Sequence, residues 1–188
     1  MASAAVALCG CAPRDPYISA PAQTVTAGQW QIERQTDRVT GAPLSSATLI
    51  TRTVAHTAVA FPPPASLQLM CFKEQPIVRL AFQFKIGSTR NSVLGYVFDD
   101  QPGREPEARF VDGYHAVVIE DQAEVARFAR ALAAAKVLYV RVRSLNAGRS
   151  SAEFRVDGAS VAIAAAYAGC PLPPDQPAPA PKRTSALQ

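Results

Sequence analysis

Residues 66–85 read SLQLMCFKEQPIVRLAFQFK, with apolar side chains spaced two apart on both sides of a polar centre. In the first half, Leu67, Leu69 and Cys71 fall on one face of an extended strand. The second half places four apolar residues on one face in the same way: Val78, Leu80, Phe82 and Phe84. The polar run at residues 73–76 is the connecting turn. We therefore predict a pair of antiparallel strands with one buried face.

Similar alternation recurs before and after this stretch, each time bounded by residues that favour turns. The further strands are predicted over residues 29–33, 47–54, 94–98, 114–119, 137–143 and 152–156. Residues 61–64 read FPPP and predict an extended surface passage, because proline cannot donate a ladder hydrogen bond. With Phe110, residues 114–119 are expected to complete a half-exposed antiparallel sheet.

Two helices are predicted after these strands. The first begins at Asp121, an N-cap followed three residues later by Glu124 as in a capping box. Its buried face has Val125, Phe128, Ala129 and Leu132 at helical spacing, and its exposed face has Glu124, Arg127 and Arg130. The second is alanine-rich, follows Gly158 and ends at Gly169. The predicted fold class is α+β, mainly β: an antiparallel sheet, meander or small sandwich with two packed helices.

The composition is that of one folded domain. The chain has 188 residues, of which 48% are hydrophobic and 18% charged, which is enough to bury a substantial core. The formal net charge is +4 without a run of Lys or Arg, which argues against nucleic acid as a partner. The positive balance leaves a weak attraction to anionic lipid or glycan surfaces open. The globular domain is assigned to residues 29–170.

The N-terminus has the pattern of a lipoprotein processing site. Leu8, Cys9, Gly10 and Cys11 follow an apolar run at residues 2–8, and small residues before a cysteine are what the processing peptidase needs. We expect residues 1–10 to be a signal peptide and Cys11 to be lipidated. Because the apolar run is short and no Lys or Arg precedes it, this signal peptide could be truncated. The alternative is a frayed tail with two incidental cysteines.

The lipid would be the only membrane anchor, since no other stretch approaches the ~20 apolar residues of a spanning helix. Residues 11–28 are then expected to be a linker, and residues 171–188 a proline-rich disordered tail. Ala12 rather than an aspartate follows Cys11. For a Gram-negative source this favours an outer-membrane lipoprotein that faces the periplasm.

Cys71 and Cys170 remain as candidates for a disulfide. In an oxidising compartment two such cysteines are expected to pair, and the loop they close would stabilise the domain by about 4–5 kcal/mol in the chain-entropy model. The alternatives are two inert thiols, or a metal or nucleophile role. The last is disfavoured because neither cysteine has a CxxC or histidine neighbour.

The acidic and histidine residues offer only weak catalytic candidates. Five carboxylates crowd one stretch: Asp99, Asp100, Glu105, Glu107 and Asp112. Paired carboxylates can hydrolyse bonds or bind Ca²⁺, but this spacing fits no defined metal motif, and solvated turns and strand ends explain it. His56 and His115 lie outside known motifs, although His115, Asp112 and a serine could form a triad. We expect no catalytic residue, metal or cofactor.

A basic stripe is the best candidate for partner binding. Tyr139, Arg141 and Arg143 point outward from one predicted strand, and Arg155 from the next. Together they would form a cationic face able to hold carboxylates or phosphates, with an added aromatic contact. The alternative is a solvated sheet face flanked by Glu153.

The order of short motifs along residues 30–170 resembles the periplasmic type VI secretion-associated (VasI-like) protein family. The motifs are Trp30, Leu67-x-Leu69-x-Cys71, Gly95-Tyr96-x-Phe98-Asp99, Phe128-x-x-x-Leu132, Val140-Arg141-Val142-Arg143, Ala152-Glu153-Phe154-x-x-x-Gly158, Ala162-Ile163 and Cys170. The resemblance implies a small, disulfide-closed, β-rich accessory domain.

We therefore expect a non-enzymatic, lipid-anchored envelope accessory or assembly protein, with an envelope or secretion-complex protein as partner. The alternative is a binding module or inhibitor that captures a peptide, a glycan or an envelope hydrolase. A third hypothesis, a hydrolase that uses the acidic stretch, would require Asp99 and Asp100 for turnover.

Overall fold

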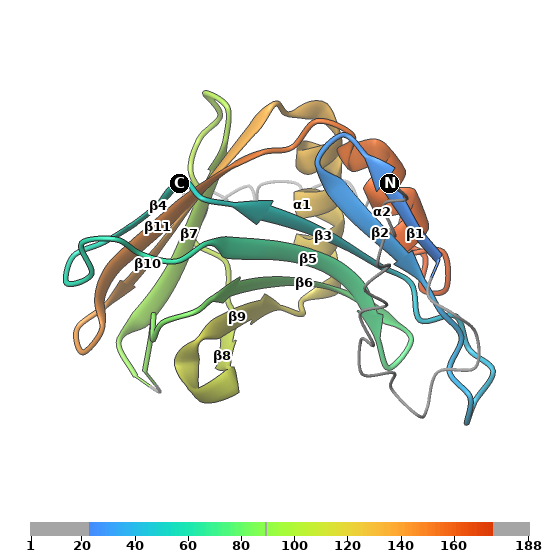
Figure 1. Cartoon of the computed structure of the whole chain (residues 1–188), viewed down its shortest axis with the longest axis horizontal. Coiled ribbons are helices and arrows are strands. Elements are labelled where there is room, and N and C mark those ends of the chain that lie inside the picture. Colours follow the sequence, from blue (N-terminus) through green and yellow to red (C-terminus); the bar gives the residue numbers. More distant parts are fainter. Residues whose placement is uncertain (1–22, 89, 175–188) are drawn as a thin grey trace, which may run out of the picture.

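A computed structural model describes residues 23–88 and 90–174, and this part of the chain is mainly β with two helices (Figure 1). All strand pairs are antiparallel. One sheet has seven strands, in the order β1 (Gln23–Ala27), β2 (Trp30–Arg34), β3 (Ser46–Thr51), β5 (Ala65–Phe72), β6 (Gln75–Phe82), β9 (Ala116–Ile119) and β8 (Arg109–Val111). The other has four: β4 (Val54–His56), β11 (Gly148–Arg155), β10 (Val137–Ser144) and β7 (Ser92–Phe98).

The hairpin predicted from residues 66–85 is the centre of the larger sheet. β5 pairs with β6 so that Leu67 lies opposite Leu80 and Leu69 opposite Val78, and all four side chains are buried. The connecting residues Lys73 and Glu74 both have positive φ, 50° and 62°. A two-residue turn of this hand matches the right-handed twist of the paired strands.

The two sheets share one core, because their inner faces pack together and against both helices. After β3 the chain leaves the larger sheet, and β4 joins the edge of the smaller sheet through β11. The largest buried side chains come from both sheets and from α1 (Gln122–Ala134); among them are Trp30, Phe128 and Phe154. The tertiary structure is therefore a two-sheet sandwich in which the chain passes back and forth between the two sheets.

Both helices pack on the seven-stranded sheet, α1 against β6 and α2 (Ala159–Ala166) against β2, β3 and β5. As predicted, α1 begins after Asp121, whose side chain accepts the Glu124 backbone N–H at 2.8 Å. The predicted disulfide is present: Cys71 at the end of β5 is bonded to Cys170 beyond α2, with an S–S distance of 2.00 Å. It fastens the C-terminal part of the fold to the central hairpin.

The prediction of a linker over residues 11–28 was wrong for residues 23–27, because these residues form β1, which pairs along its whole length with β2. The hairpin turn contains Gly28, whose φ is +61° and whose absent Cβ would lie 2.4 Å from the Asp157 carbonyl oxygen. This turn therefore packs backbone to backbone against the start of α2. The strand escaped prediction because its one large apolar residue, Val25, is 46% exposed and gives no core-facing pattern.

The sheet expected to be half-exposed is buried on both faces at β9, where no residue exceeds 4% exposure. Val118 lies between Arg79 of β6 and Arg109 of β8 in the register. The aliphatic stems of two such long side chains can cover an apolar neighbour while their charged ends stay in water.

Candidate functional site

The four residues of the predicted basic stripe lie on the outer face of the four-stranded sheet. In β10, Leu138, Val140 and Val142 are buried in the core, so Tyr139, Arg141 and Arg143 point the other way. In β11, the residues opposite Val137, Tyr139, Arg141 and Arg143 are Arg155, Glu153, Ser151 and Arg149 in turn. We call this surface the arginine face: Tyr139, Arg141, Arg143, Arg149 and Arg155.

Arg149 was missed because the strand was predicted to begin at residue 152, whereas β11 begins at Gly148. The preceding glycine has a positive φ of 75°, which closes the hairpin from β10 four residues earlier than expected. The additional residues at the start of β11 include Arg149, which lies directly opposite Arg143.

Glu105 binds two arginines of this face. Its Oε1 accepts from Arg141 Nη2 at 3.2 Å and from Arg143 Nη2 at 2.6 Å. Glu105 reaches the sheet because the neighbouring Arg104 exchanges two 2.9 Å backbone hydrogen bonds with Tyr96 of β7. A carboxylate that was expected to be solvated in a turn is therefore held on the arginine face.

A groove of about 350 Å³ lies beside this carboxylate. Its lining includes Arg104, Glu105, Tyr139 and Arg141, together with Gly95 of β7. A Cβ at Gly95 would make ordinary contacts, 3.6 Å from both the Arg104 carbonyl oxygen and the Glu105 Cγ. Glycine is therefore not required by sterics here, but it leaves the groove deeper than any other residue would.

A buried ionic cluster fixes one wall of the groove. Glu124 on α1 accepts from the Tyr96 hydroxyl at 2.5 Å, from Arg104 Nε and Nη2 at 3.2 Å each, and from Arg127. The residue is only 7% exposed, so its predicted place on the outer face of α1 was wrong. Helical spacing cannot reveal this burial, because Tyr96 and Arg104 come from another part of the chain.

The protonation of the cluster follows from these contacts. Burial by itself would raise the pKa of Glu124, but hydrogen bonds from Arg104 and Tyr96 and the nearby guanidinium charges outweigh it and lower the pKa below 4.5. Burial, together with the Glu124 carboxylate, raises the pKa of Tyr96 well above its usual range. Glu124 is thus a fixed anion and Tyr96 a neutral donor, an arrangement that positions Arg104 and is poorly suited to proton transfer.

Three of the other candidate catalytic residues have separate partners, while Asp100 and Glu107 are exposed. The Asp99 carboxylate accepts the backbone N–H of Val137 at 2.9 Å, and the Asp112 carboxylate binds Arg79. The His115 ring Nδ1 lies 2.9 Å from the Asp112 backbone oxygen, not from its carboxylate. Within residues 23–88 and 90–174, no group of three or more His, Cys, Asp or Glu side chains could hold a metal ion.

A second hollow of about 640 Å³ lies beside β8 and β9. Its charged lining residues are Arg109, Glu107, Glu120 and Asp121, and Arg109 is joined to Glu120 by hydrogen bonds of 2.8 and 2.5 Å. That pairing lowers the pKa of Glu120 against the opposing effect of burial. Because Arg109 is already held by Glu120 and the other charged lining residues are acidic, this hollow lacks the cationic chemistry of the arginine face.

The expected lipidation site Cys11 lies outside the described residues, as do the rest of residues 1–22 and residues 175–188. Across the part that is described, neither helix has the length and apolar character needed to span a bilayer.

Comparisons of the whole chain with family models, with curated proteins and with solved structures gave no match. The resemblance to the periplasmic type VI secretion-associated family therefore stays a prediction from the motifs.

Proposed function

We propose that this protein is a non-catalytic accessory of the cell envelope, anchored by a lipid at Cys11, that binds an acidic segment of a partner protein on its arginine face. The observation that supports this proposal is the position of Glu105, whose carboxylate oxygen lies between Arg141 and Arg143. The Glu105 carboxylate thus makes with these arginines the same ion pairs that a carboxylate of a partner protein would make.

The arginine face has cationic capacity beyond Glu105. Among the described residues, neither Arg149 nor Arg155 takes part in an ion pair. Guanidinium groups bind carboxylates through forked hydrogen bonds, and those on a flat sheet can be met one after another by an extended chain. Tyr139 stands beside them, half-exposed, and could pack on the partner's backbone or side chains.

The disulfide supports an extracytoplasmic compartment, because structural disulfides persist where the environment is oxidising. With the lipoprotein pattern at Cys11, this favours the envelope. The motif resemblance makes a type VI secretion apparatus the first system in which to look for the partner.

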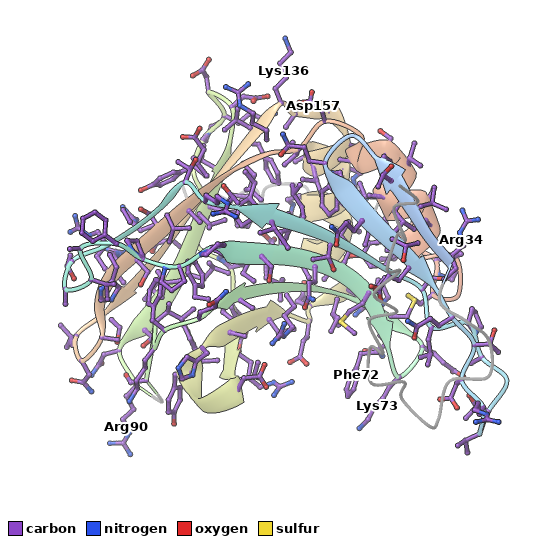
Figure 2. The ribbon with its side chains drawn as sticks, viewed as in Figure 1. Arg34, Phe72, Lys73, Arg90, Lys136 and Asp157 are labelled. Carbon is purple, nitrogen blue, oxygen red and sulfur yellow. A yellow bond between two sulfur atoms is a disulfide. The ribbon has the colours of Figure 1, made fainter. Side chains whose placement is uncertain are left out.

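The binding proposal is tested with a fluorescent peptide rich in Asp and Glu, followed by anisotropy at low salt. Arg141→Gln with Arg155→Gln should weaken binding by at least tenfold, since each lost charge-assisted contact is worth about 1 kcal/mol or more. The matched control is Arg34→Gln with Lys73→Gln, which removes two charges away from β10 and β11 (Figures 1 and 2). Equal losses in both variants, or no binding by the wild type, would reject the arginine face.

The anchor is tested separately by intact mass of the protein extracted from membranes. A mass that begins at Cys11 with diacylglycerol and an acyl chain is expected. An unprocessed, unlipidated chain would remove the anchor and the envelope location from the proposal.

A further inference from the structure

Three loops converge at the end of the four-stranded sheet farthest from α2 (Figure 1). The Thr57 N–H donates to the Arg149 carbonyl at 3.0 Å, and the Leu145 N–H donates to the Asn91 carbonyl at 3.3 Å. A ring nitrogen of His56 lies 2.9 Å from the Ala147 carbonyl oxygen. We call this surface the loop tip: residues 57–64, residues 84–91 without residue 89, and residues 143–149.

The loop tip presents two apolar side chains to solvent. Phe61 is 94% exposed and Leu145 is 81% exposed, the highest values among the large hydrophobic side chains of residues 23–88 and 90–174. Phe61 directly precedes three prolines, which restrict the backbone and keep this loop extended. Both side chains could therefore be buried in a partner surface without a large loss of backbone entropy.

The charged residues of the loop tip itself are all basic: Lys85, Arg90, Arg143 and Arg149. Carboxylates border it on one side, where Glu107, Glu120 and Asp121 line a hollow together with Ser88 and Asn91. Arg143 forms an ion pair with Glu105 from a neighbouring segment, whereas Arg149 is in no ion pair among the described residues. A hollow of about 620 Å³ is lined by Leu145, Arg143 and Arg149. Leu145 thus shares one hollow with two arginines and no carboxylate.

We propose that the loop tip binds the surface of an anionic lipid bilayer. Apolar side chains of this kind are buried at the boundary between head groups and acyl chains, and nearby arginines gain from the negative surface potential. The hollow between Arg143 and Arg149 offers a place for a lipid phosphate. The charge pattern favours a bilayer over an apolar protein groove, which would give Arg149, in no ion pair among the described residues, no anionic partner.

The test is sedimentation with vesicles, using the full-length, disulfide-bonded chain with Cys9→Ser and Cys11→Ser so that no acyl chain contributes. Vesicles of phosphatidylglycerol and phosphatidylethanolamine should bind the protein, and vesicles of phosphatidylcholine alone should bind it weakly. Binding should fall as salt rises well above about 0.1 M, where the Debye length drops below about 10 Å.

Replacing Phe61 and Leu145 by Ala should lower the partition coefficient about tenfold or more, and Arg149→Gln about fivefold. The matched control is Phe72→Ala, which removes an exposed aromatic ring far from Arg90 (Figure 2). That variant should bind as the wild type does. Because Phe61 and Leu145 are exposed, their replacement should leave the far-ultraviolet circular dichroism unchanged.

The proposal is overturned if anionic vesicles do not bind the protein, or if Phe72→Ala weakens binding as much as the loop-tip variant does. It is also overturned if replacing Phe61 and Leu145 by Ala leaves vesicle binding unchanged and weakens only the binding of a protein partner. The loop tip shares Arg143 and Arg149 with the arginine face, but Arg155 belongs to the arginine face alone, because it lies opposite Val137 at the other end of β10 from Arg143. Arg155→Gln should therefore weaken peptide binding while leaving vesicle binding unchanged.

Discussion

Replacing Glu124 by Ala should destabilise the domain by about 3 kcal/mol. The largest part comes from the Tyr96 hydroxyl, which is buried and loses its acceptor at a cost of about 1–3 kcal/mol. Arg104 and Arg127 are about half exposed, so water replaces part of their lost pairing and each contributes only about 0.2–1 kcal/mol. The Asp121 cap on α1 is retained, because it binds the backbone of residue 124.

The measurement is urea denaturation followed by circular dichroism, with a thermal midpoint that should fall by roughly 6–12 °C for a domain of this size. Glu120→Ala is the matched control: it removes a carboxylate paired with exposed Arg109 and should cost less than about 1 kcal/mol. Adding Tyr96→Phe to Glu124→Ala should restore about 1–2 kcal/mol by removing the orphaned hydroxyl. If the double variant is no more stable than Glu124→Ala, the assigned cause is wrong.

Three further outcomes are expected. Replacing Cys71 and Cys170 by Ser should lower the free energy of unfolding by about 4–5 kcal/mol, given their separation of 99 residues, and urea denaturation with and without reductant will show whether reduction affects only the wild type. Because the pKa of Glu124 is lowered on folding, its contribution to the free energy of unfolding is complete above about pH 4.5 and is lost as the pH falls further. The difference in thermal midpoint between wild type and Glu124→Gln should therefore shrink in acid, and a constant difference down to pH 3, roughly one unit below the range of an ordinary carboxyl, would contradict this. Gly28→Ala should destabilise the protein by at least 1 kcal/mol more than Gly41→Ala, since both glycines have positive φ but only at Gly28 does a Cβ meet a backbone oxygen, at 2.4 Å; equal thermal midpoints would show that the turn can shift away from α2.

The parts of the fold that sequence could predict are those whose pattern is local. The alternation in residues 66–85 and the Asp121 cap each contain their own signal, and the structure has the hairpin and α1 in those places. The disulfide followed from counting cysteines in a compartment that was itself inferred. β1 was lost because it adds a strand to a sheet edge without adding a core face.

The candidate site was only partly predictable, since its decisive contacts join distant segments. Outward alternation placed Tyr139, Arg141 and Arg143 on one face, but nothing local indicates that Glu105 would bind two of them. In the same way, Glu124 has the helical position of a surface residue and is buried only because Tyr96 and Arg104 reach it. Sheet order, which decides such meetings, leaves no periodic signal in the sequence.

The bond between Cys71 and Cys170 also sets an order of events during synthesis. Cys71 emerges 99 residues before its partner, which at about 5–20 residues per second leaves it a free thiol for roughly 5–20 s. The central hairpin, β7 and α1 can all form in that interval, but α2 and the covalent closure come last. In an oxidising compartment the Cys71 thiol therefore stays open to pairing with thiols of other chains until almost the entire domain has been delivered.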